Sequence, residues 1–76
     1  MNTLSELLAI LRKRRGLSQY ELSTRAGLSE RQVSRYETGG AAVMSARSFS
    51  GLLATLPETD EEREAMLAAL AALAGE

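Results

Sequence analysis

The chain has 76 residues, which is enough for one small domain with a thin hydrophobic core. It contains no cysteine and no histidine, which excludes disulfides, thiolate nucleophiles, imidazole bases and ordinary zinc sites. The composition is 45% hydrophobic and 25% charged, with no signal peptide and no apolar run long enough to span a bilayer. We therefore expect a cytoplasmic globular protein with no membrane, metal or cofactor partner.

Charge is distributed unevenly along the chain, although its net value is only −1. Residues 1–36 carry seven basic and three acidic side chains, a balance of +4, whereas residues 37–76 carry two basic and seven acidic ones, a balance of −5. A polyanion such as DNA would bind the basic half. A solvated helical surface explains the same charges without a partner, so the choice depends on the motifs.

Repeated start signals divide the chain into helices. A hydroxyl residue followed three positions later by Glu or Gln forms a capping box, and this pattern occurs at Thr3/Glu6, Ser18/Glu21, Ser29/Gln32 and Thr59/Glu62. Glycines occur where left-handed residues would end the first three helices, at Gly16, Gly27 and Gly39. Together with apolar residues at helical spacing, these signals predict helices over about 4–15, 19–26, 30–37, 46–56 and 60–74, and a loop over 39–44. Because no β alternation occurs, we expect an all-α, compact five-helix bundle that forms a single domain over 1–76.

Residues 19–38 are the most informative stretch, because two short helices joined by a glycine-containing turn form a helix-turn-helix. The positions where two such helices cross are small or apolar: Leu22, Ala26, Gly27, Leu28, Val33 and Tyr36. A wider set of matches follows a known spacing, namely Gly16-Leu17-Ser18-Gln19, Glu21-Leu22, Ala26-Gly27-Leu28-Ser29, Val33-Ser34, Glu37 and Gly39. Over residues 4–56 the chain therefore resembles the helix-turn-helix family of lambdoid phage repressors and Cro proteins, also called the Xre family.

The chain departs from that family in three places. Ser23 stands where the family usually has alanine, so its hydroxyl needs a partner. The loop over 39–45 is longer than usual before Phe49 and lacks the usual proline and basic residues, which argues against phosphate contacts from it. The tail over 58–74 resembles an actinobacterial-style subtype that often begins larger regulators. The chain is therefore either a whole small regulator or the N-terminal DNA-binding domain of a larger one.

The resemblance implies that the third helix enters the major groove as the recognition helix. Helical spacing directs Arg31, Ser34, Arg35 and Thr38 away from the core. Arg31 and Arg35 lie one turn apart, so both can take the acceptors of guanine, unless they are simply solvated. Ser34 and Glu30 are the other expected base contacts, although Glu30 equally suits the helix dipole.

Phosphate contacts are expected mainly at the starts of the two helices. Gln19, with the free N–H groups beside it, resembles the family's phosphate clamp, since a helix N-terminus is an anion site. Tyr20 either adds a hydroxyl to a phosphate or is half-buried, and the remaining expected phosphate contacts are Ser29 and Thr38. The basic run of Lys13, Arg14 and Arg15 is expected to contribute only weakly, because bases in a last helical turn also complement the dipole.

The resemblance also implies a structural ion pair between Arg12 and Glu37. An enzyme is not expected, because without His or Cys catalysis would need paired carboxylates in a buried cleft. The leading interpretation is a sequence-specific transcriptional regulator that binds a pseudo-palindromic double-stranded DNA operator as a homodimer. The alternative is a protein-interaction module, such as an antitoxin or adaptor, that binds a protein partner through its last helix. The leucines of that helix form a stripe that is either core or interface: Leu67, Leu70 and Leu73.

Overall fold

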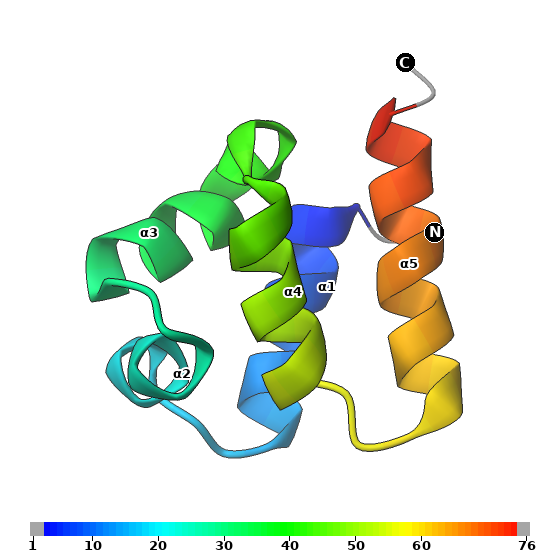
Figure 1. The fold of residues 1–76 in the computed structure, drawn as a ribbon. Coiled ribbons are helices and arrows are strands. Elements are labelled where there is room, and N and C mark those ends of the chain that lie inside the picture. Colours follow the sequence, from blue (N-terminus) through cyan, green and yellow to red (C-terminus); the bar gives the residue numbers. More distant parts are fainter. Residues whose placement is uncertain (1–2, 75–76) are drawn as a thin grey trace.

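The structure, a computed structural model, describes residues 3–74. Five α-helices follow one another in that range: α1 (Leu4–Arg14), α2 (Gln19–Ala26), α3 (Glu30–Arg35), α4 (Ala46–Thr55) and α5 (Asp60–Ala74) (Figure 1). A widened helical turn over Tyr36–Gly40 and a 3-10 turn over Ala41–Val43 connect α3 to α4, and no β-strand occurs in the described range. The predicted all-α, five-helix class is confirmed. None of these helices is both long and apolar enough to cross a membrane.

Side-chain caps begin the helices much as predicted. Three capping boxes are complete, with both reciprocal hydrogen bonds made, at Thr3/Glu6, Ser18/Glu21 and Ser29/Gln32. The fourth differs in one bond. The hydroxyl of Thr59 accepts the N–H of Glu62 at 3.1 Å, but the carboxylate of Glu62 accepts the N–H of Glu58 at 2.8 Å instead of that of Thr59. The prediction of a regular box at Thr59 is therefore wrong in its second half.

The third helix ends earlier than predicted. Regular α geometry stops at Arg35, and the next turn widens before the chain reverses at Gly39, where φ is 107°. Thr38 leaves the helical region and donates its hydroxyl back to the carbonyl of Ser34 at 2.9 Å. Helices α1 and α4 end within one residue of their predicted limits.

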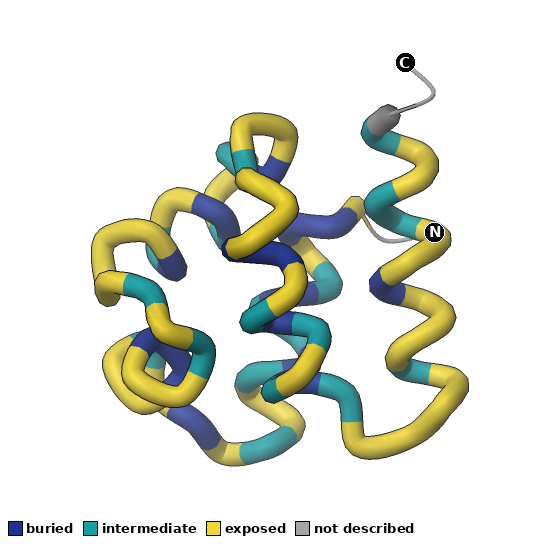
Figure 2. Tube along the Cα trace, viewed as in Figure 1, coloured by how far each residue is buried: buried dark blue, intermediate teal, exposed yellow. Residues whose placement is uncertain are grey.

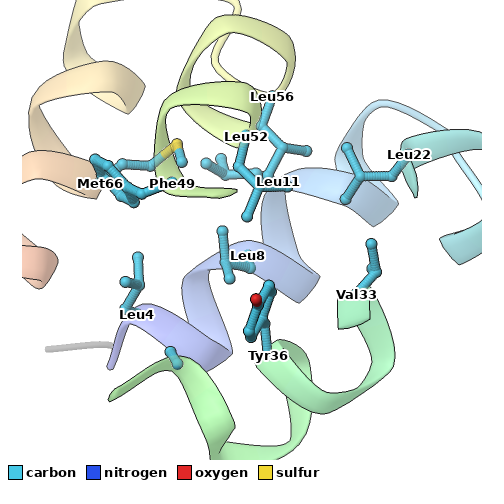
Figure 3. Close-up of a cluster of buried hydrophobic side chains, with 11 residues drawn as sticks. Leu4, Leu8, Leu11, Leu22, Val33, Tyr36, Phe49, Leu52, Leu56 and Met66 are labelled. Atoms are coloured by element: carbon cyan, nitrogen blue, oxygen red, sulfur yellow. The ribbon is translucent and has the colours of Figure 1, made fainter. Parts of the chain in front are cut away.

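The core lies where α1 and α4 meet the other helices, and buried side chains from all five helices converge on it (Figures 2 and 3). Its members are Leu4, Leu8, Leu11, Leu22, Val33, Tyr36, Ala41, Phe49, Leu52, Leu56 and Met66. Leu53 of α4 is only partly buried and packs against this core. Helix α5 contributes a single fully buried side chain, Met66, while Leu67 of the predicted stripe is 44% exposed. Ala69, Leu70 and Leu73 of the same helix are partly buried and pack against this core.

Candidate nucleic-acid interface

Helices α2 and α3 form a helix-turn-helix at the side of the molecule opposite α5, with α1 and α4 between (Figure 1). Gly27 ends α2 in the left-handed region, with φ 74°, and Ser29 caps α3 two residues later. Leu22 and Val33 are buried between the two helices and the core. Ser23, which stands at a family alanine position, is buried and donates its hydroxyl to the carbonyl of Tyr20 at 2.6 Å. Buried side chains therefore fix the motif against the core, and one face of α3 stays exposed.

That uncovered face forms one wall of an open concavity between α3 and the start of α2. The residues lining it are Gln19, Glu30, Arg31, Ser34, Arg35 and Thr38. All six were predicted to contact DNA, four of them through bases and two through phosphates. The remaining two predicted contacts, Tyr20 and Ser29, do not line the concavity. Six of the eight predicted DNA contacts therefore lie around one concavity.

The two arginines of α3 have unused donors. Arg31 and Arg35 are exposed, and within residues 3–74 neither makes an ion pair or a side-chain hydrogen bond. Glu30 is exposed at the first position of the helix, where a negative charge suits the helix dipole. Ser34 is half-buried on the same wall. The wall therefore combines guanidinium donors with hydroxyl and carboxylate acceptors, which is the chemistry that base edges in a major groove require.

Arg12 and Glu37 lie together under the concavity. Arg12 Nε donates to Glu37 Oε2 at 2.7 Å, and a terminal guanidinium nitrogen of Arg12 donates to Glu37 Oε1 at 3.1 Å. The other terminal nitrogen of Arg12 donates to the carbonyl of Leu17 at 2.7 Å. The two side chains are only 12% and 5% exposed, so this ion pair is largely shielded from water. It is the pair that the family resemblance implied.

Gln19 joins this ion pair, which sequence reasoning missed. Its Nε2 donates to Glu37 Oε1 at 3.1 Å, across 18 positions of sequence. Nothing in the spacing of the two residues reveals the contact, because it depends on how α2 packs across the turn after α3. The expected phosphate clamp is therefore bound to the structural ion pair on its inner side.

The other expected phosphate contacts differ in how free their hydroxyls are. Tyr20 is 64% exposed, so the half-buried alternative is wrong. The oxygen of Ser29 accepts the N–H of Gln32 at 3.1 Å, which leaves its hydroxyl hydrogen available. Thr38 already donates to the Ser34 carbonyl, so its hydroxyl would have to rotate before it could donate to a phosphate.

The basic run at the end of α1 is partly neutralised by acids of the α4–α5 connection and α5. Arg14 pairs with Glu62 at 3.1 Å, and Arg15 lies 3.9 Å from Glu58 and also donates to the carbonyl of Thr55. The pKa of Glu62 is lowered, first by the backbone N–H of Glu58 and also by Arg14. Lys13 is exposed without a described acidic partner. The acidic run was visible in the sequence, but its position against α1 was not.

The fold and this face together define a helix-turn-helix domain of the DNA-binding type. A family model described as a helix-turn-helix domain matches residues 3–66, which extends from the cap of α1 to the middle of α5. The chain belongs to this helix-turn-helix domain family. No curated protein and no solved structure matches the chain.

Proposed function

We propose that the chain is a cytoplasmic, sequence-specific regulator of transcription of the Xre type, which binds double-stranded DNA with α3 in the major groove. The observation that carries the proposal is the concavity in which two unpaired arginines face away from the core beside the start of α2. Arg31 and Arg35 would each take the O6 and N7 acceptors of a guanine, and Glu30 would accept from a cytosine amino group. Ser34 can contact either kind of base.

Contacts around that wall would fix the register of the domain on the phosphate backbone. Gln19 begins α2, whose first backbone N–H groups point out of the helix toward an anion. The exposed hydroxyls of Tyr20 and Ser29 lie next to the starts of α2 and α3. Such contacts position the protein but carry no sequence information.

A pair of titrations tests the assignment. An operator is first selected from a random duplex pool, and each variant is titrated against it and against a scrambled duplex. Arg31→Ala and Arg35→Ala should each cost about 1–3 kcal/mol on the operator and relax base preference at one position of each half-site. Arg63→Ala is the matched control, because it removes an exposed arginine from α5. Equal losses on both duplexes would contradict the assignment of α3 as the reader.

We further propose that the protein binds as a homodimer. One small module covers only about 600–1,000 Å² of protein surface, which is little for tight specific binding. An apolar groove between α4 and α5, lined by Phe49, Leu53, Leu67 and Leu70 among others, supports this proposal. Two copies joined there would present two recognition helices to half-sites about one helical turn, roughly 34 Å, apart.

The dimer proposal is tested by the mass of the complex. Leu67→Glu should leave one chain per duplex and weaken operator binding, because a charge in the groove opposes association. Ala65→Glu is the control, since Ala65 is exposed on α5 outside the groove. Light scattering measures the mass of each variant, free and bound to DNA. An unchanged mass for Leu67→Glu, or a footprint of one half-site in the wild type, would contradict the dimer.

The same groove favours a second candidate, a protein-interaction module that binds a partner helix through α4 and α5. Salt dependence separates the two functions. Affinity for DNA falls linearly with salt on a log–log scale, whereas insertion of an apolar helix into a groove responds little.

A further inference from the structure

We infer that Glu37 is a positioning residue for DNA binding: its buried carboxylate holds the Gln19 amide in the orientation in which it meets the phosphate backbone. This inference rests on the proposed function. It adds a role to a residue that the family resemblance treats as part of a structural pair.

The carboxylate of Glu37 determines which end of the Gln19 amide points inward. An ionised carboxylate only accepts hydrogen bonds, so it selects the NH₂ end and would repel the carbonyl end. One Nε2 hydrogen is used in the 3.1 Å bond to Oε1. The second Nε2 hydrogen remains, and Gln19 lines the concavity beside the recognition face of α3. A phosphate is also acceptor-only, so a donor directed outward is what it needs.

Arg12 makes the carboxylate a fixed support. Its guanidinium donates to both oxygens of Glu37, from Nε to Oε2 at 2.7 Å and from a terminal nitrogen to Oε1 at 3.1 Å. This bidentate pair fixes the plane of the carboxylate. The same guanidinium is anchored to the Leu17 carbonyl, directly before the cap of α2. The charge of Arg12 also offsets that of Glu37, which would otherwise repel a phosphate bound at Gln19.

The bond from Gln19 is not needed to satisfy Glu37. Each carboxylate oxygen already accepts a hydrogen bond from Arg12 without it. The bond instead restrains Gln19, a long side chain with several rotamers, before any ligand arrives. Restraint of this kind lowers the ordering cost of binding and so increases affinity without a new contact.

A double-mutant cycle on a mixed-sequence duplex tests the inference, because a phosphate contact does not require the operator. The variants are Gln19→Met, Glu37→Gln and the double mutant, titrated well below their melting temperatures. Gln19→Met should weaken binding about tenfold in the wild-type background, the expected effect of losing a hydrogen bond to a charged group. In the Glu37→Gln background the same change should cost less than about twofold, because an amide at position 37 both donates and accepts hydrogen bonds and no longer fixes which end of the Gln19 amide points inward.

The outcomes separate this inference from the function on which it rests. Equal losses from Gln19→Met in both backgrounds would show that Glu37 acts only on stability and would overturn the inference. A wild type that binds no duplex even at low salt would contradict the proposed function instead.

A second measurement uses only the wild-type protein, so it does not depend on whether a variant folds. In the free wild-type protein, the Gln19 side-chain NH₂ should be rigid on the ps–ns timescale by NMR relaxation, because the Glu37 carboxylate holds it. A mobile Gln19 amide would overturn the inference as well.

Discussion

Glu37 is a nearly buried carboxylate whose charge is matched by one neighbouring guanidinium. Removing a single partner of such a pair leaves the other charge uncompensated. We expect Arg12→Ala to lower the free energy of unfolding by up to about 3–5 kcal/mol, and the Leu17 carbonyl would also lose its donor. Thermal and urea denaturation measure the loss. Lys13→Ala, at an exposed neighbouring position, is the control and should leave stability unchanged.

DNA binding distinguishes a structural Arg12 from a contacting one. If Arg12 is structural, Arg12→Ala weakens DNA binding only in proportion to the unfolded fraction. Unchanged melting together with poor binding would instead make Arg12 a phosphate contact.

At the residue scale, prediction from sequence worked where spacing along one helix decides the outcome. Arg31, Ser34 and Arg35 share a face because they lie on α3, and the structure groups them as the helical period requires. Prediction failed where the partner comes from another element. Gln19 meets Glu37 only through packing, and the hydroxyl of Thr38 turns back because the helix widens after Arg35.

The crossing of α4 over the end of α2 depends on the lack of a side chain at Gly51. A Cβ at this position would overlap the carbonyl oxygen of Ala26. Helix propensity alone favours Gly51→Ala by about 0.5–1 kcal/mol, whereas overpacking costs about 1–3 kcal/mol. We therefore expect net destabilisation in urea titrations, with the exposed Ser50→Ala neutral as the control. A stabilised Gly51→Ala would mean that the two helices can separate at little cost.

The helix caps predict how stability changes with pH. The pKa values of Glu6 and Glu21 are lowered from 4.5, mainly because each carboxylate accepts the backbone N–H of its cap residue, Thr3 or Ser18. Below pH 4.5 the unfolded chain therefore binds more protons than the folded one, and stability falls as the pH drops. Glu21→Gln keeps an acceptor for the cap but cannot titrate, so its stability should fall less steeply in acid.

Urea midpoints measured across the acid range check this expectation. Glu64→Gln is the control, because Glu64 is exposed on α5 and outside any capping box. The prediction is contradicted if Glu21→Gln and Glu64→Gln change the acid slope equally.

At the element scale, helix starts were predictable because a cap is a local feature of four residues. The buried faces of the helices were less predictable from the sequence. The stripe at Leu67, Leu70 and Leu73 indicated the side of α5, yet the helix is rotated so that Met66 is its fully buried residue and Leu67 borders a groove. In an alanine-rich helix a small rotation costs little, so the sequence constrains that rotation weakly.

At the scale of the whole molecule, the acidic and basic halves of the chain meet at one end. Acids at Glu58 and Glu62 lie against Arg14 and Arg15, away from the recognition face of α3. The arginine of the closer pair is 61% exposed, so water screens it and it adds little to stability. The main consequence of these contacts is electrostatic, because two of the three side chains of the basic run, Arg14 and Arg15, face carboxylates before DNA arrives.

Releasing those arginines should strengthen binding to any duplex. The double change Glu58→Gln with Glu62→Gln removes both acidic partners while keeping hydrogen-bonding side chains at the start of α5. We expect higher affinity on operator and scrambled duplex alike, and a log–log salt slope steeper by about one unit for each arginine that reaches a phosphate. Glu61→Gln with Glu64→Gln is the matched control, because it changes the net charge equally at exposed positions that contact no arginine among the described residues. The two double variants therefore differ only in whether arginines are released. If both raise affinity equally, net charge alone governs the effect, and the contacts of Arg14 with Glu62 and of Arg15 with Glu58 have no bearing on DNA binding.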